Sequence, residues 1–347
     1  MLTITELTPA ERPAWDSYVQ QSPHGLPLHL AGWQDVLRQT HGYETRFLLA
    51  REAGQIVGVL PLFLVRSRLL GHTATSMPGG LCADTPAGAQ ALLSAAQTIA
   101  RQAGIRRLRL QDTRQVWPGP LQNSCHHEHW LVDTSMGAGA LWHKLDGNIR
   151  RQVRIGRKND LRVEIDRTGR LLDDFYDVFR RFTHQSGTPV FGRDFLANVV
   201  HAFPTGHNIA VIYQGTQPIG GYFQLEMPPL MLGMWGASLR DYLPLRPVYL
   251  GLWSILEDAA NRGFSHLDMG RSPAGSNASH FKGQWGGVCA PVHQQLMHIN
   301  RRPGAAAPAP DIQSDGKMQL FMRLWPRLPL PVAQFLGPRL RRHIPFA

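Results

Sequence analysis

Two hydrophobic periods alternate along the chain, and they occur twice in the same order. The stretch FLLAREAGQIVGVLPLFLV, which begins at Phe47, holds two runs rich in Val, Ile, Leu and Phe around a short polar turn with glycine. This pattern is typical of a β-hairpin. The stretch IAVIYQGTQPIGGYFQLEM, which begins at Ile209, repeats the plan, and its QPIG at 217–220 aligns with QIVG at 55–58.

A helical period follows each predicted hairpin. In ALLSAAQTIARQAGIRRLRLQD, apolar residues from Leu92 onward recur at the spacing of one helix face, and Gly104 precedes a strand. The later stretch LGLWSILEDAANRGFSHLDMG shows the same helix, with a glycine stop at Gly263 and a strand to Met269. The repeat predicts a mixed α/β (α+β) fold with two tandem domains of one type, over residues 1–135 and 136–300.

The last part of the chain has a different pattern. Residues 301–316 are rich in Pro, Ala and Gly without apolar periodicity, which predicts a linker. Residues 317–347 interleave apolar residues with arginine and proline, and no acidic residue follows Asp315. This basic amphipathic tail either contacts an anionic membrane surface or packs back on the domains through Phe321, Leu324, Trp325 and Phe335.

Composition limits the classes of protein that fit. The chain has 347 residues and a formal charge of +11, which favours anionic partners. No apolar run is long enough to cross a bilayer, and no export signal is visible at the N-terminus. Three widely spaced cysteines do not form a disulfide framework. We therefore expect a cytoplasmic protein, peripheral to the inner membrane if the tail binds lipid.

Motif searches are mostly negative. We find neither a phosphate-binding P-loop nor a dinucleotide fingerprint, and no zinc-finger or RNA-recognition pattern that would indicate nucleic acid as a partner. The stretch CHHEH at 125–129 holds potential metal ligands, but such crowded ligands rarely complete a site. We expect a surface loop there and no metal. The basic residues Arg150, Arg151 and Arg154 fall on one helix face, which either binds phosphates or is simply solvated.

The stretch DMGRSPAGSNASHFKGQWG, from Asp268, places charge and glycine together where a strand ends. Ligands of α/β sheets bind at the carboxyl ends of strands, and a loop that begins at Gly270 can bring backbone N–H groups close to an anion. Arg271 and Lys282 would add positive charge. Alternatively, Asp268 pairs with Arg271 and the following aromatic residues fill a core.

Several stretches resemble the FemAB-related proteins associated with exosortase/PEP-CTERM systems, which carry GNAT-type domains of the BioF2-like acetyltransferase branch. The resemblance rests on GNIRRQVRIGRKNDLRVEI, SGTPVFGRDFL, HLDMGRSPAGSNASHFKGQWG and LWPRLPLPVAQFLGPRLRR. It implies tandem GNAT-like domains, a catalytic second domain and a cleft between the domains for the acceptor. The usual coenzyme A turn of GNAT enzymes is replaced by SLRDYLPLRPVYLGLW before the helix that starts near Val248.

The function that follows is acyl transfer to an amine or hydroxyl of a cell-envelope or exopolysaccharide precursor, a small-molecule or lipid-linked saccharide. The donor is an acyl-CoA or an aminoacyl-tRNA, and tRNA is a partner only in the second case. The alternative is a non-catalytic GNAT-like module that binds an anionic saccharide or nucleotide-sugar. Asp268 and Glu226 are the candidate bases. The candidate residues for binding donor or acceptor are Arg150, Arg151, Arg154, Gly187, Thr188, Pro189, Tyr242, Arg246, Gly270, Arg271, Lys282 and Trp285.

Overall fold

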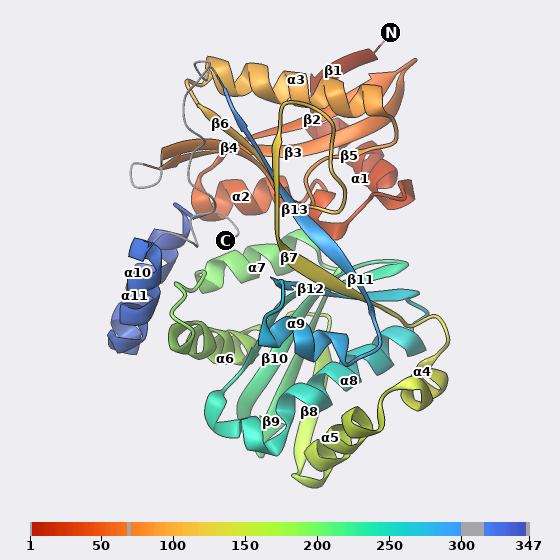
Figure 1. Ribbon diagram of the computed structural model, residues 1–347, viewed down its shortest axis with the longest axis vertical. Coiled ribbons are helices and arrows are strands. Elements are labelled where there is room, and N and C mark those ends of the chain that lie inside the picture. The colour runs from red at the N-terminus through yellow and green to blue at the C-terminus, as the bar shows by residue number, and fades with distance from the viewer. Residues whose placement is uncertain (1, 68–70, 300–315, 345–347) are drawn as a thin grey trace. The chain divides into compact units, whose positions relative to one another are not determined.

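The computed structural model describes residues 2–67, 71–299 and 316–344, and these form two compact units (Figure 1). Unit 1 comprises residues 1–128, 290–306 and 342–347, and unit 2 comprises residues 129–289 and 307–341. The division thus falls inside two strands, after Glu128 and after Cys289. The expected boundary at 135/136 lies a few residues later, and most of the predicted linker at 301–316 lies outside the described residues.

Unit 1 is a mixed sheet with helices. In chain order its elements are β1 (Leu2–Glu6), η1 (Pro9–Glu11), α1 (Arg12–Gln21), η2 (Pro27–His29), α2 (Trp33–His41), β2 (Glu44–Glu52), β3 (Gln55–Ser67), β4 (Gly71–Pro78), β5 (Cys82–Ala83), α3 (Pro86–Gln102), β6 (Arg107–Thr113) and the first half of β7 (Gln122–Asp133). The strand order is β1-β2-β3-β4-β6-β13, where β13 is Val288–His298. β13 lies within the expected range of the second domain, 136–300, and it pairs antiparallel with β6.

Unit 2 repeats this plan. Its elements are the end of β7, α4 (Ala138–Lys144), α5 (Gly147–Lys158), β8 (Leu161–Asp166), α6 (Leu172–Gln185), α7 (Arg193–Ala202), β9 (His207–Gln214), β10 (Gln217–Met227), β11 (Leu230–Ser238), η3 (Arg240–Leu245), α8 (Pro247–Asn261), β12 (His266–Pro273), α9 (Asn277–Gly283), α10 (Gly316–Leu324), η5 (Trp325–Arg327) and α11 (Leu330–Arg341). The strand order is β7-β12-β11-β10-β9-β8.

Both predicted hairpins are present. In the first, β2 and β3 pair up to Glu52 and Gln55 across a two-residue turn, with Ala53 and Gly54 at positive φ. That backbone follows the strand twist and favours glycine. In the second hairpin β9 and β10 pair up to Gln214 and Gln217. The predicted helices are α3 and α8, and each joins two parallel strands, β4 to β6 and β11 to β12.

Alternate residues of the unit 2 strands pack against helices on opposite faces of the sheet. Ala210 and Ile212 of β9 lie in a core with α5 and α8, together with Leu267 of β12. The opposite face is covered by α6, where the ring of Phe175 contacts that of Phe223 at a centroid distance of 5.9 Å. Figure 1 shows α6 and α8 on the two sides of this sheet. A side chain next to Leu267 along β12 therefore points to the α6 side.

Candidate active site

The strands β11 and β12 pair over only part of their length. The parallel ladder runs from Leu230 with His266 to Leu232 with Asp268. Beyond that pair these strands, both wholly described, share no further registered residues, while β11 remains paired with β10 up to Ser238. The registered ladder therefore ends at Asp268, on the carboxyl side of two parallel strands, where α/β sheets bind ligands.

A bulge and two facing glycines mark this point. β11 carries an extra residue, Met234, because Phe223 pairs with Trp235 while Gln224 pairs with Gly233. A Cβ atom on Gly270 would lie 2.5 Å from the backbone oxygen of Gly233, and Gly270 has φ +71°. Only glycine meets both requirements without strain. Bulges of this kind leave one residue out of the ladder and occur next to active sites.

Asp268 is paired with a histidine from the neighbouring strand. Nδ1 of His129, in β7, lies 2.9 Å from Oδ2 of Asp268, and Oδ1 of Asp268 accepts a hydrogen bond of 2.8 Å from the backbone N–H of Gly270. The side chain of Asp268 is 2% exposed and that of His129 is 10% exposed. An ionised carboxylate can only accept, so an ionised Asp268 pairs with the His129 tautomer that has its proton on Nδ1 and a lone pair on Nε2.

The loop after β12 is held by Lys282 of α9. Its ammonium donates to the backbone oxygen of Gly270 at 2.7 Å and to that of Arg271 at 3.2 Å. These contacts position the loop, and the predicted contribution of Lys282 to a phosphate site stays a prediction. On the same helix, Ser279 accepts a hydrogen bond of 2.8 Å from the indole N–H of Trp130. The α9 helix thus fastens the loop to the strand that carries His129.

The two units differ at equivalent places. In unit 1, β4 and β6 stay joined to the end, since Pro78 pairs with Gln111 and the N–H of Gly79 donates to the backbone oxygen of Gln111 at 2.8 Å. The N-terminus of α3 is capped by Thr85, which accepts from the N–H of Gly88. The N-terminus of α8 has no side-chain cap, and its N-cap residue Arg246 has φ +67°. The ladder that ends early and the uncapped helix therefore belong to unit 2.

Glu226 is part of an ion-pair network. Arg262 binds both carboxylate oxygens of Glu226, at 2.5 and 2.7 Å, and Asn208 donates to Oε1 at 3.1 Å. Hydrogen bonding to Glu226 raises the pKa of Arg262 above its usual value. The carboxylate of Glu226 thus joins the end of α8 to β10. The role of Glu226 as a base stays a prediction.

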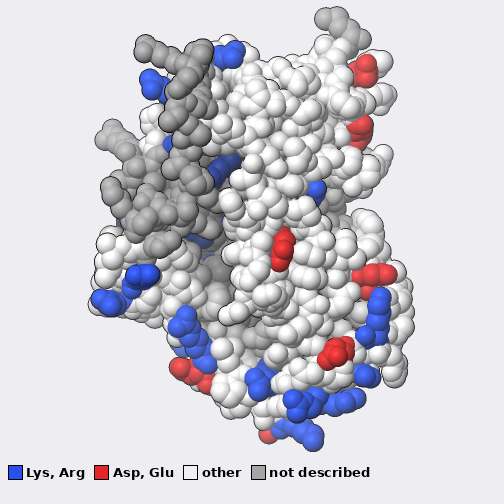
Figure 2. All heavy atoms as spheres, in the orientation of Figure 1, with Lys and Arg blue, Asp and Glu red and all other residues white. Residues whose placement is uncertain are grey.

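The basic residues of α5 share a solvated face. Arg151 and Arg154 are exposed, and Arg154 lies over the ring of Trp142 at 5.6 Å. Arg150 is partly buried, and its Nε has no hydrogen-bond partner. Figure 2 shows Lys and Arg side chains gathered over the part of unit 2 that contains α5. Their predicted role in binding phosphates stays a prediction.

The predicted acceptor loop lies under the tail. The backbone oxygen of Met322 lies 2.2 Å from the position of a Cβ on Gly187, which has φ +75°. Arg341 donates to the backbone oxygen of Pro189 at 3.1 Å. Gly187 and Pro189 are buried, and Thr188 between them is partly exposed. The three residues are therefore brought together, and the tail covers them.

The aromatic candidates lie in the same core. Trp285 is 1% exposed and packs against Tyr249 and Phe281, as the alternative interpretation of this stretch expected. It also lines a pocket of about 320 Å³ with residues of α4 and the segment after α9. Tyr242 is partly buried beside this core. Stacking of either ring on a ligand stays a prediction.

The CHHEH stretch is not the surface loop that we expected. It lies in β7, where His127 and His129 are buried and Cys125 and His126 are exposed. In the described part of the chain, no group of three or more His, Cys, Asp or Glu residues could hold a metal ion. His129 was named only as a potential metal ligand. The sequence signal for a strand is weak there, because polar residues occupy consecutive positions in HHEH.

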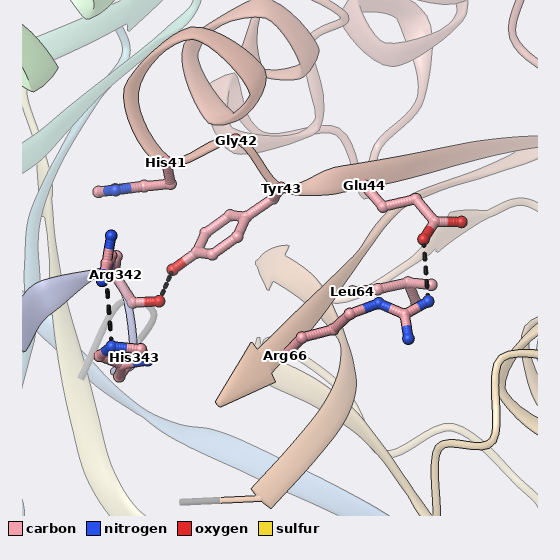
Figure 3. Close-up of a pocket in the computed structure, with 8 residues that line it drawn as sticks. All are labelled: His41, Gly42, Tyr43, Glu44, Leu64, Arg66, Arg342 and His343. Atoms are coloured by element: carbon pink, nitrogen blue, oxygen red, sulfur yellow. Dashed lines mark hydrogen bonds and ion pairs between the residues drawn. The ribbon is translucent and has the colours of Figure 1, made fainter. Parts of the chain in front are cut away.

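Unit 1 contains a larger, open cavity of about 660 Å³ (Figure 3). The hydroxyl of Tyr43 donates to the backbone oxygen of Arg342 at 2.7 Å, and Arg66 lies 3.3 Å from a carboxylate oxygen of Glu44. His41 and His343 also line the cavity. Hydrogen bonds from Arg46 and Arg66 lower the pKa of Glu44. The cavity is therefore lined both by arginines and by a carboxylate that stays ionised. Its described lining residues do not include a histidine hydrogen-bonded to a buried carboxylate, as His129 is to Asp268.

Comparisons with known proteins agree with this geometry. Residues 143–283 match the family model described as an acetyltransferase (GNAT) domain. The structure is similar to that of FemX, with a TM-score of 0.68 at 14% identity, over 84% of this chain and 96% of that one. It is also similar to L-PGS from Bacillus licheniformis, with a TM-score of 0.56 at 12% identity, over 93% and 98% of the two chains.

A tandem GNAT protein from the clavulanic acid biosynthesis pathway gives a TM-score of 0.55 at 12% identity, over 87% of this chain and all (100%) of that one. No curated protein matches the chain in sequence. At such identities the likeness concerns the fold. The predicted mixed α/β fold with tandem GNAT-like units is confirmed. Residues 143–283 are therefore similar in sequence to an acetyltransferase (GNAT) domain.

Proposed function

We propose that unit 2 transfers an acyl group from an activated donor to an amine or hydroxyl, with His129 as general base and Asp268 as the residue that positions it. The observation that carries this proposal is the buried His129–Asp268 pair at the end of the ladder between β11 and β12. A GNAT-type domain over residues 143–283 supports the reaction class. Acyl transfer needs a base for the nucleophile and donors for a developing oxyanion.

The proposed reaction transfers one proton through His129. Nε2 of His129 takes the proton from the attacking amine or hydroxyl as the new C–N or C–O bond forms. The bond from the carbonyl carbon to the leaving sulfur or oxygen then breaks, and the imidazolium returns the proton to the leaving group. Asp268 stabilises the imidazolium and fixes its tautomer. The backbone N–H of the bulged Met234 is a candidate donor to the oxyanion.

The donor that we favour is an acyl-CoA, which is a substrate that supplies a thioester. The N–H groups at the N-terminus of α8 lack a side-chain cap, and such groups bind phosphate oxygens. Arg246 at the N-cap adds a positive charge, and its Nε is buried without a hydrogen-bond partner. An aminoacyl-tRNA is the alternative donor. The acceptor class, a cell-envelope or exopolysaccharide precursor, rests on the resemblance to FemAB-related proteins of exosortase/PEP-CTERM systems.

The test of the base is a pair of substitutions. His129→Gln keeps a donor toward Asp268 but cannot take a proton, and Asp268→Asn removes the charge that stabilises the imidazolium. We expect each to lower kcat, His129→Gln by about 10²- to 10⁴-fold, with a small change in KM. His126→Gln is the matched control, because His126 is exposed on the same strand. Full activity of His129→Gln would refute the proposed base.

The donor is tested by thermal unfolding with free CoA, acetyl-CoA, nucleotide-sugars and aminoacyl-tRNA. A ligand at about 100 times its Kd stabilises the protein by about 2.7 kcal/mol. We expect stabilisation by CoA and acetyl-CoA. Stabilisation by polyanions alone, with a steep loss in salt, would instead indicate a non-catalytic binding module.

A further inference from the structure

We propose that α10 and α11 form a docking surface for an anionic lipid bilayer, which they contact through their outward faces. Most of the exposed large apolar side chains in the described part of the chain lie in this tail. They are Leu320, Met322, Leu324, Val332 and Phe335. The others lie singly: Val116 in the loop after β6, Leu243 in η3 and Val288 in β13. Scattered apolar residues are ordinary on a surface, whereas a contiguous set indicates a contact.

The exposed residues fall at helical spacing. On α10, Leu320, Arg323 and Leu324 are at i, i+3 and i+4, and all three are exposed. On α11, Val332, Phe335 and Arg339 are at i, i+3 and i+7 and are likewise exposed. Residues at these spacings share one face of a helix. Each helix thus presents apolar side chains flanked by arginine outward, as interfacial helices do.

The opposite faces of the tail hold it to unit 2. Trp325 is 3% exposed, and Ala333 and Gly337 are buried. A Cβ on Gly337 would lie 3.0 Å from the backbone of Val190, so α11 packs closely on this residue. Arg341 binds the backbone oxygen of Pro189 and lies over the ring of Phe191 at 4.2 Å. Of the residues that the packing alternative named, Trp325 is buried and Phe321 is partly buried, whereas Leu324 and Phe335 are exposed.

The positive charge of the outward faces of α10 and α11 indicates an anionic partner. Residues 316–347 contain no Asp or Glu, and Arg323, Arg327 and Arg339 are exposed. The guanidinium of Arg339 lies 3.6 Å from the centre of the Phe335 ring, so charge and apolar surface are held together. An anionic bilayer offers phosphate groups to the arginines and hydrocarbon to the apolar side chains.

The basic face of α5 shows that charge alone does not define such a surface. Arg151, Arg154 and Arg157 are exposed there, but the apolar residues Ile149 and Val153 are buried. The α5 helix therefore offers charge without hydrocarbon. No helix among the described residues is long and apolar enough to cross a membrane. The contact that we propose for the tail is accordingly interfacial. Because the tail covers the predicted acceptor loop at Gly187–Pro189, this contact would bring that loop to the membrane.

The experiment is co-sedimentation of the full-length protein with vesicles of phosphatidylcholine, alone or mixed with phosphatidylglycerol. We expect binding to the mixed vesicles, little binding to the neutral ones, and a loss of binding as salt rises from about 0.1 to about 1 M. The triple variant Arg323→Gln/Arg327→Gln/Arg339→Gln should lower the partition coefficient by about 100-fold. Leu324→Asp/Phe335→Asp should abolish binding without changing the thermal unfolding, because both side chains are exposed.

Two matched controls separate this surface from general stickiness. Leu243→Asp changes an exposed leucine in η3, and Arg151→Gln/Arg154→Gln removes two charges from α5. We expect Leu243→Asp to bind like the unchanged protein and the α5 variant to bind much better than the tail triple variant. Failure to bind anionic vesicles would overturn the proposal. Equal vesicle binding by Leu324→Asp/Phe335→Asp and the unchanged protein would also overturn it. If that variant changed its oligomeric state but not its vesicle binding, the surface would instead bind a protein partner. Acyl transfer to a soluble acceptor is measured separately, so failure of either proposal leaves the other testable.

Discussion

Lys282 is the residue that fixes the loop beside the candidate base. Its two hydrogen bonds go to the backbone oxygens of Gly270 and Arg271, so the side chain acts on the site through the shape of the loop. Gly270 in turn donates its N–H to Asp268. A disturbance of Lys282 therefore reaches the carboxylate through a single backbone residue.

We expect Lys282→Met to loosen this loop while keeping the apolar stem of the side chain. Two hydrogen bonds from a charged group are lost, which should lower the free energy of unfolding by about 1–3 kcal/mol. Faster hydrogen exchange at residues 270–275 and a fall in kcat should accompany the loss. Lys158→Met, at an exposed end of α5, is the control. Unchanged exchange in Lys282→Met would show that the two contacts do not order the loop.

At the same scale, the sequence indicated Asp268 but not its partner. Asp268 stood out because it follows an apolar run and precedes a glycine-rich loop. His129 is 139 residues away along the chain, and its strand has polar residues on both faces, which hides the period of two. Pairing between strands that are distant in sequence leaves no local pattern, so the dyad could not be derived from residue order.

At the scale of elements, what matters is where β11 and β12 stop pairing. The hairpins and the two connecting helices could be predicted from the spacing of their apolar residues and from the glycines that follow the helices. These signals depend only on residues that are neighbours in the sequence. The bulge at Met234 and the early end of the ladder could not, because they depend on which residues of β10, β11 and β12 stand opposite one another. The contrast with β4 and β6, which remain paired, shows only in three dimensions which copy has the ladder that ends early.

Substitution of Gly270 tests the geometry at this end of the ladder. In Gly270→Ala the residue keeps φ +71° and its new Cβ meets the backbone oxygen of Gly233 at 2.5 Å. Gly275→Ala is a close control, since Gly275 has φ +68° and an added Cβ there meets nothing within 4 Å. We expect Gly275→Ala to cost about 1 kcal/mol from backbone conformation alone, and Gly270→Ala to cost about 1–3 kcal/mol more.

Urea unfolding measures both free energies, and kcat should fall in Gly270→Ala alone. Equal unfolding free energies for the two variants would mean that β11 and β12 can move apart freely at this point. In that case the early end of the ladder would not be a fixed feature of the fold.

At the scale of the whole molecule, each unit has its own hydrophobic core. One core forms around α3 and the strands beside it, and the other around α5 and α8. The repeat in the sequence predicted this duplication. It did not predict that β13 would return to unit 1, because an isolated apolar run does not reveal which sheet it joins.

The stability of unit 1 should depend on pH through His29. This side chain is 1% exposed, its Nδ1 accepts the N–H of Leu26 at 3.1 Å, and burial lowers its pKa from 6.5 to about 4. As pH falls below 6.5, the unfolded chain gains a proton that the folded chain does not, so the free energy of unfolding falls until folded His29 is protonated near pH 4. Between about pH 7 and pH 5 this contribution is about 2 kcal/mol.

The difference between the unchanged protein and His29→Gln, measured by urea unfolding at each pH, isolates this contribution because the other titrating groups are common to both. The exposed His280 serves as control, since His280→Gln should keep the full slope. If His29→Gln lost stability as steeply as the unchanged protein over this range, the buried imidazole would not be the source of the acid sensitivity.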